Sequence, residues 1–311
     1  MIRYIKILFS LSLLFAASGA RAQQVASTGF IPDARSAGFA GASVAMDAHS
    51  MSLYANMAAT SFGDPSYRIQ ASYGYSSLGD KTSMHSVGGY FRLDEKHTFA
   101  VGGRYFMPNE IQNTQDGINF TKVKPYDLMI DFAYACRVND VLALSVNARY
   151  INSKLNEGNG FNTASIVAVD WGLHLRKKAY SLAATISNLG MLVDYGVGKY
   201  RMPANLRVGG AYHWEPADDH KVTGLAEVRY NFMPSDYQFF SGGMGAEYML
   251  KGMVAVRGGY YMSNETKAVG NYGAVGLGVY LGAIVADFSY NLAETGSPMN
   301  KIWRVTAGVR F

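Results

Sequence analysis

The sequence predicts an all-β fold: a transmembrane, antiparallel, up-and-down β-barrel of about 14 strands with an N-terminal helical hatch inside its lumen. Three observations predict it: an export signal at the start, amphipathic strand patterns from about Tyr67 to the end, and short turns that alternate with longer loops. We therefore predict three segments, a signal peptide at 1–22, a hatch at 23–66 and a barrel at 67–311.

The first residues have the order of a secretory signal peptide. A basic start is followed by an apolar run over 7–17, and Ala20-Arg21-Ala22 before Gln23 matches a cleavage site, so we expect cleavage after Ala22. The apolar run of about 11 residues is too short for a membrane anchor. No later segment has the ~18 to 20 uninterrupted apolar residues of a membrane helix.

Composition favours a β-protein whose outer surface meets lipid. Charged residues make up 16% of the chain, against about 25% in soluble domains, and the chain has 34 Gly and 22 Tyr. The single cysteine, Cys136, excludes a disulfide framework. The net charge of +5 comes without a basic stretch interleaved with aromatics, so no nucleic-acid partner is expected.

Strict alternation of apolar and polar residues predicts the strands. In the last segment, Trp303, Val305 and Phe311 share one face, and Arg304 and Arg310 share the other. About 14 segments follow this pattern, each long enough to cross a bilayer as a tilted strand. The predicted spans are 67–76, 83–93, 97–107, 125–137, 140–153, 162–177, 179–189, 204–214, 219–231, 237–249, 252–262, 270–280, 282–293 and 301–311.

The connections between these spans alternate in length. Every second junction is short, such as "DEKH", "VND", "KKA" and "LKG", whereas the others include longer loops near 108–124, 154–161, 190–203 and 263–269. Outer-membrane barrels have short periplasmic turns and longer extracellular loops. The pattern therefore predicts an outer-membrane location.

The alternation also assigns the charged residues to the lumen. A charge on the lipid face would cost ~2 to 4 kcal/mol at the bilayer midplane. Both signs occur, which favours an ion-paired, structural lumen over an open pore. The predicted lumen charges are Asp170, Arg207, Glu227, Arg229, Glu247, Arg257, Asp287 and Arg304, with Asp131, Arg149 and Arg176 on the same face. Phe311, a terminal aromatic on the lipid face, resembles the assembly signal of bacterial outer-membrane barrels.

A search for catalytic and metal-binding patterns finds none. The six histidines lack metal-ligand spacing, and there is no P-loop or nucleophile elbow. His174 and Asp170 share a face but stand about 13 Å apart along a strand. We therefore expect no enzyme activity, no cofactor and no metal.

The stretch from Gly29 to Phe62 is rich in Ala, Gly and Ser and has no strand period. Wall side chains alone fill the lumen of barrels with up to about 8 strands. The lumen of a 14-stranded barrel must therefore be occupied by another segment of the chain. Small residues let short helices pack closely against the wall. We expect Asp33, Arg35 and Asp47 to pair with lumen charges, and Asp47 and Asn56 to act as cap or turn residues.

This stretch resembles the N-terminal signature of the PorV/PorQ family, FadL-like barrels of Bacteroidota. The matching residues include the predicted hatch residues Arg35, Gly38, Gly41, Asp47, Tyr54 and Asn56. Five later stretches match in order. They are "ISNLG" at 186–190, which resembles a family turn, "MPANLRVGGAY", "GAEYML" with "VRGGYY", and "ADFSYN".

The resemblance implies a 14-stranded barrel with its N-terminal segment inside, and a non-enzymatic part in type IX secretion. In that system one member binds the C-terminal signal domain of exported cargo, so the resemblance implies recognition and not catalysis. We expect protein partners from the type IX secretion or surface attachment machinery, contacting the loop at 108–124 through Ile111, Ile118 and Phe120. Two alternatives stay open: a FadL-like outer-membrane transporter of hydrophobic small molecules, and a structural barrel without a ligand.

Overall fold

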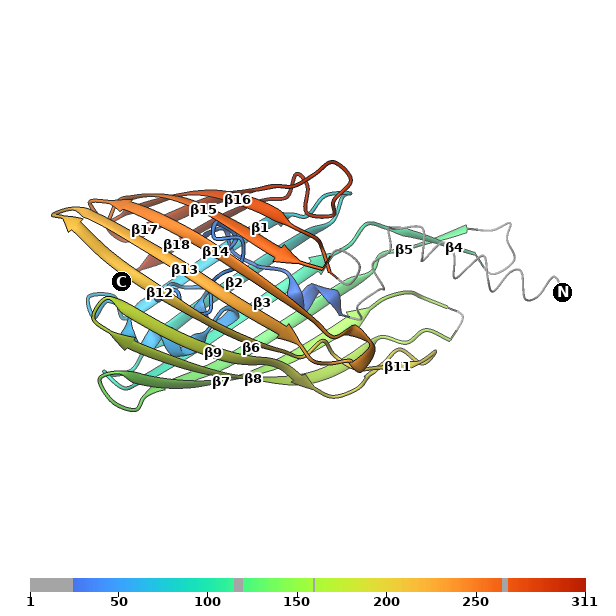
Figure 1. The fold of residues 1–311 in the computed structure, drawn as a ribbon. Helices are drawn as coiled ribbons and strands as arrows, with labels where there is room; N and C mark the ends of the chain where they lie inside the picture. Colours follow the sequence, from blue (N-terminus) through green and yellow to red (C-terminus); the bar gives the residue numbers. More distant parts are fainter. Residues whose placement is uncertain (1–24, 115–119, 159, 265–267) are drawn as a thin grey trace.

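A computed structural model describes residues 25–114, 120–158, 160–264 and 268–311. The predicted signal peptide and its cleavage site after Ala22 lie outside the described residues. Fourteen antiparallel strands form one closed barrel (Figure 1), which confirms the predicted fold class. These strands are β1 (Ile69–Ser77), β2 (Ser83–Arg92), β3 (His97–Met107), β6 (Tyr126–Arg137), β7 (Leu142–Lys154), β8 (Ala164–Lys177), β9 (Tyr180–Gly190), β12 (Asn205–Ala217), β13 (His220–Asn231), β14 (Phe239–Leu250), β15 (Val254–Ser263), β16 (Tyr272–Leu281), β17 (Ile284–Leu292) and β18 (Trp303–Arg310).

Pairing of the first and last barrel strands closes the sheet. The register of β1 with β18 runs from Gln70 opposite Arg310 to Ser77 opposite Trp303. Beyond it, the backbone N–H of Ile69 donates to the carbonyl of Phe311 at 2.9 Å, and the N–H of Phe311 donates back at 2.8 Å. The predicted assembly residue therefore completes the seam with its backbone, and its ring is 62% exposed on the outer surface.

The two ends of the barrel differ. Two short hairpins, β4 (Ile111–Thr114) with β5 (Phe120–Val123) and β10 (Val193–Asp194) with β11 (Lys199–Tyr200), lie at the end opposite the C-terminus. We call this the long-loop end and the other the short-turn end. Figure 1 shows both hairpins extending past the barrel wall.

The alternating sequence pattern becomes an apolar outer face and a polar inner face. On β3, Phe99 and Val101 are about half exposed, whereas Ala100 and Arg104 are buried. An outer surface of this kind suits hydrocarbon, because lipid has no partner for polar side chains. No helix in the described part of the chain is long and apolar enough to cross a membrane.

The stretch at 186–190, expected to resemble a turn, is instead part of β9 and contains a bulge. Val169 lies opposite Leu189 and Trp171 opposite Ile186, so two residues of β9 face Asp170 alone. The second of them, Asn188, has a φ of 62° and donates its backbone N–H to Asp170 Oδ1 at 2.6 Å. A bulge of this kind changes the direction in which a side chain points. Here the Asn188 side chain is buried inside the barrel.

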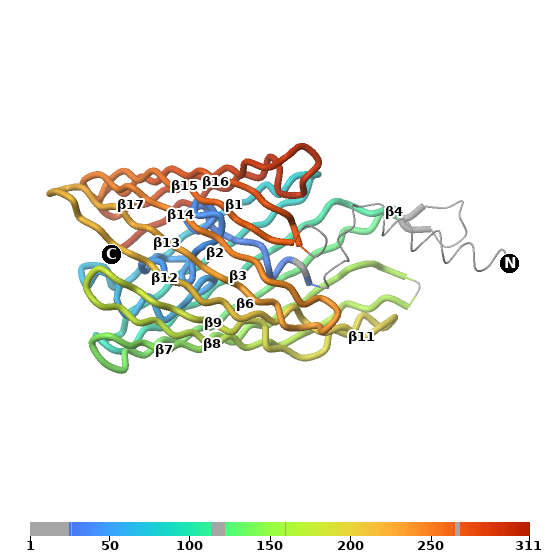
Figure 2. Tube along the Cα trace, viewed as in Figure 1, coloured from blue at the N-terminus to red at the C-terminus, as the bar shows by residue number. Residues whose placement is uncertain are grey.

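Residues 25–66 follow an irregular path inside the barrel (Figure 2). They contain the helices η1 (Ala26–Gly29), α2 (Ala34–Gly38), η2 (Ser52–Tyr54) and η3 (Met57–Phe62). The path begins with η1 near the long-loop end. Helix α2 then packs against β15 to β18, and η3 packs against β3, β6, β7 and β8. We keep the name hatch for this segment.

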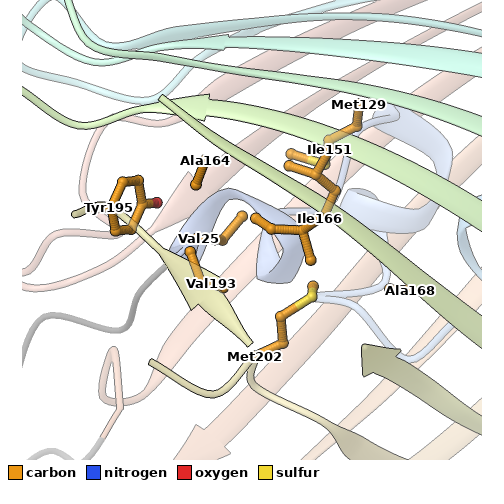
Figure 3. Close-up of a cluster of buried hydrophobic side chains, with 9 residues drawn as sticks. All are labelled: Val25, Met129, Ile151, Ala164, Ile166, Ala168, Val193, Tyr195 and Met202. Carbon is orange, nitrogen blue, oxygen red and sulfur yellow. The ribbon is translucent and has the colours of Figure 1, made fainter. Parts of the chain in front are cut away.

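At the long-loop end, the start of the hatch is buried in an apolar cluster. Figure 3 shows Val25 of the hatch among side chains from the barrel wall and the β10 region. The cluster comprises Val25, Met129, Ile151, Ala164, Ile166, Ala168, Val193, Tyr195 and Met202. Burial of these groups holds the beginning of the hatch against one side of the wall.

Candidate functional site

The best candidate site is the interface between hatch and inner wall, where most of the predicted residues meet. α2 begins at Asp33, whose side chain accepts the N–H of Ser36 at 2.8 Å, the usual N-cap arrangement. His49 Nε2 lies 3.5 Å from Asp33. Burial raises the pKa of Asp33, but the His49 ring and the Ser36 donor outweigh it and hold that pKa below its usual range.

Small residues bring α2 against the wall. Ala34 and Ala37 are almost fully buried, and the N–H of Ala34 donates to Thr306 Oγ1 at 2.9 Å. A Cβ on Gly38 would lie 3.4 Å from the Gly276 Cα of β16, so the two backbones are in close contact. The Ala/Gly/Ser composition of the hatch therefore has a packing reason.

Arg35 leads from the hatch into a chain of charges on β14, β15 and β17. Arg35 lies 3.5 Å from Glu247, and Arg257 donates to Glu247 and to Asp287 at 2.6 Å each. Glu247 and Arg257 are direct cross-strand partners. A Cβ at position 278 would stand 2.6 Å from Asp287 and 2.7 Å from Arg257, so glycine there lets the pair meet across β16.

Glu227 of β13 holds the middle of the hatch. Arg207 contacts both of its oxygens, at 2.7 and 2.8 Å, while the backbone N–H groups of Ser43 and Val44 each donate to it at 2.9 Å. Arg207 also donates to Ser43 Oγ at 2.8 Å and to the Gly41 carbonyl at 3.4 Å. One carboxylate thus satisfies a wall guanidinium and two hatch amides together.

Asp47 is the third ionic link. It accepts from Arg176 at 2.5 Å and from Lys221 at 2.9 Å, and His213 lies 3.5 Å away. Burial raises the pKa of Asp47, but the charges of Lys221, Arg176 and His213 together outweigh it and hold the pKa well below its usual range. Asp47 therefore joins strands β8, β12 and β13 through the hatch.

Tyr54 and Asn56 bind the wall through neutral groups. The Tyr54 hydroxyl donates to the carbonyls of Val87 at 2.6 Å and Gly103 at 3.2 Å, and its ring lies 4.7 Å from the Arg104 guanidinium. Asn56 caps η3 by accepting the N–H of Ala58 at 3.1 Å. Its amide donates to the carbonyls of Val44 and Leu173.

A second charge network lies in the wall itself. Arg149 contacts Asp131 at 2.6 Å and Asp170 at 2.8 Å, and Arg104 contacts Asp131 at 3.4 Å. Arg149 also donates to the Asn188 side chain at 2.6 Å. The bulge in β9 therefore positions the Asn188 side-chain amide within hydrogen-bond distance of Arg149.

The predicted lumen charges thus fall into separate groups. Glu227 forms ion pairs with Arg207 and, at 3.5 Å, with Arg229. Glu247 pairs with Arg257 and Arg35, and Asp170 pairs with Arg149. Arg304 has no carboxylate within ion-pair distance among the described residues; it donates to the Ile31 carbonyl at 3.0 Å. We did not anticipate Arg104, His213 and Lys221, although each has lumen parity in the sequence, so alternation alone could have identified them.

The predicted loop residues lie apart from the hatch. Ile111 is 39% exposed on β4, Phe120 begins β5, and Ile118 lies outside the described residues. No group of three or more potential metal ligands occurs in the part of the chain that the structure describes. Cys136 is a free, half-buried thiol.

Comparison with known proteins agrees with this geometry. The model of the family "Type IX secretion system protein PorV" matches residues 20–238. A search of curated proteins found no match.

Several solved structures have a similar fold. The toluene transporter TodX of Pseudomonas putida superimposes with a TM-score of 0.61 at 13% identity, covering 88% of this chain and 95% of that one. The toluene transporter TbuX of Ralstonia pickettii has a TM-score of 0.57 at 14% identity, covering 89% and 97%.

A Pseudomonas aeruginosa FadL homologue has a TM-score of 0.53 at 10% identity and covers 90% of this chain and 98% of that one. At these identities the likeness shows a FadL-like fold alone. The family match over residues 20–238 spans more than half of the chain. This protein is therefore a member of the PorV family of outer-membrane β-barrels.

Proposed function

We propose that this barrel is a non-enzymatic component of type IX protein secretion or of a related surface-protein assembly. It binds a partner or cargo domain through the rim at its long-loop end, which faces the cell exterior. The predicted signal peptide at 1–22, cleaved after Ala22, carries the chain out of the cytoplasm.

The observation that carries this proposal is the ionic fixation of the hatch. Glu227, Glu247 and Asp47 each hold hatch groups against different strands. Breaking a buried ion pair by removing one partner costs about 3–5 kcal/mol, so a hatch with several such links stays in the lumen. A filled lumen makes the rim the accessible surface of the protein.

The β4–β5 hairpin is the first candidate for contact at this rim. It extends past the wall (Figure 1) and presents Ile111 to solvent. An exposed aliphatic residue on a projecting element is the kind of anchor that buries itself against a partner.

Affinity capture from mild-detergent extracts tests the proposal. We expect the tagged protein to retain type IX secretion proteins, and Ile111→Asp to lose them. Gln112→Asp is the matched control, because neighbouring residues of a strand point to opposite faces. No specific partner with the unaltered chain, and unchanged surface proteins after gene deletion, would contradict the assignment.

The second candidate function is FadL-like transport of a hydrophobic small molecule. It is favoured by the FadL-like fold and by an internal cavity of about 170 Å³ beside the hatch. Mass spectrometry of material extracted from the purified barrel tests it: a recurrent apolar compound supports transport, and its absence together with a captured partner supports assembly.

A further inference from the structure

A cavity of about 170 Å³ lies inside the barrel between the hatch and the long-loop end. Phe30 and Ile31 of the hatch form one side, and the wall residues Arg229, Tyr261 and Tyr272 form another. The loop residue Val269 also lines the cavity. A smaller polar cavity of about 60 Å³ shares Arg229 and Phe30 with it, so the two adjoin.

Rings dominate the apolar part of this cavity. Tyr261 and Tyr272 lie with ring centroids 5.1 Å apart, and Tyr237 meets Phe239 edge to face at 5.1 Å. Phe30 is stacked on Phe106. Such surfaces offer both faces and edges to a further planar ring.

The same cavity contains a buried guanidinium with a free donor. Arg304 has no exposed surface, and its Nη2 has no hydrogen-bond partner among the described residues. Its other nitrogens donate to the Ile31 carbonyl and to Asn291. The hatch carboxylate Asp33 pairs with His49, and Arg304 has no ion pair among the described residues. This differs from Arg257, which has two carboxylate partners.

Arg229 supplies a second incompletely used cation. Its only ion pair in the described residues is the 3.5 Å contact with Glu227, which Arg207 already occupies in bidentate geometry. The Nε of Arg229 has no hydrogen-bond partner within the part of the chain that the structure describes. Arg229, Tyr272 and Arg304 line the same cavity, and the Tyr272 hydroxyl donates to the Ala40 carbonyl at 3.5 Å. A buried donor without a partner is costly, and a bound acceptor would remove that cost.

We propose that this cavity is a binding site for a small aromatic carboxylate with one ring, such as benzoate. The ring lies among Phe30, Tyr261 and Tyr272, and the carboxylate accepts hydrogen bonds from both Arg229 and Arg304. The volume supports a single ring, since an apolar cavity of about 150 Å³ holds one benzene molecule. A long acyl chain needs more room, and a neutral hydrocarbon leaves the arginine donors unpaired. This site is independent of partner binding at the rim.

Calorimetric titration of the full mature barrel in lipid nanodiscs tests the site with benzoate, toluene and decanoate as probes. We expect saturable binding of benzoate, at least about tenfold tighter than of toluene or decanoate, because a hydrogen bond to a charged group is worth that much or more. Arg229→Gln should weaken benzoate about tenfold.

Val269→Trp should abolish binding by filling the cavity while leaving every arginine in place. Val197→Trp is the matched control, an exposed valine at the same end that does not line the cavity. Equal affinity for toluene or decanoate, no saturable benzoate binding, or binding that survives Val269→Trp would each overturn the proposal. Because neither tryptophan variant changes Ile111, capture of partners at the rim is a separate readout.

Discussion

Glu227→Gln should loosen the middle of the hatch without unfolding the barrel. The carboxylate is 6% exposed and accepts two hatch amides and both arms of Arg207. An amide of the same shape keeps one acceptor oxygen but loses the charge. Removing one partner of a buried ion pair costs about 3–5 kcal/mol, and this cost acts on the docked state of the hatch.

Native-state hydrogen exchange measures that cost at the residues involved. The amides of Ser43 and Val44 should exchange roughly 100-fold to 4,000-fold faster in the variant, because each 1.4 kcal/mol is a factor of ten. Amides in the β12–β13 ladder should keep their protection. Glu215→Gln, an exposed carboxylate at the end of the same hairpin, is the control. Unchanged exchange at Ser43 and Val44 in a folded Glu227→Gln barrel would refute the idea that this carboxylate anchors the hatch.

Three further predictions concern the hatch and the outer face. Asp47→Asn should lower the apparent melting temperature at pH 7. Because the folded pKa of Asp47 lies below its unfolded value, the difference from the unaltered chain should shrink as pH falls below about 4; a constant difference down to pH 3 would contradict the ionic role. Gly102→Ala should destabilise by about 1–3 kcal/mol through a clash with Tyr54, while Gly103→Ala, whose Cβ meets only ordinary contacts, should be near neutral in the same thermal assay. Phe132→Arg, on the lipid face, should cost about 2–4 kcal/mol in folding into vesicles, and an effect under 1 kcal/mol would argue against membrane burial of that position.

Much of the barrel could be predicted because a strand encodes its two faces locally. Alternation places Val101 outside and Arg104 inside whatever the neighbouring strands are. Each of the 14 predicted spans overlaps one strand of the closed barrel. The same alternation predicted that the charged residues face the lumen, because a charge on the lipid face costs several kcal/mol.

The tertiary structure alone decided which charges meet. Glu247 faces Arg257 because of the β14–β15 register, and Arg257 reaches Asp287 because β16 has glycine between them. The bulge at Asn188 depends on pairing with β8, and the family resemblance had suggested a turn there. The hatch path is also a tertiary result, because Asp47 is bound by cations more than 120 residues away in the chain. A single strand carries its own periodicity, but register, crossing distances and the route of an irregular segment arise only when the strands close around it.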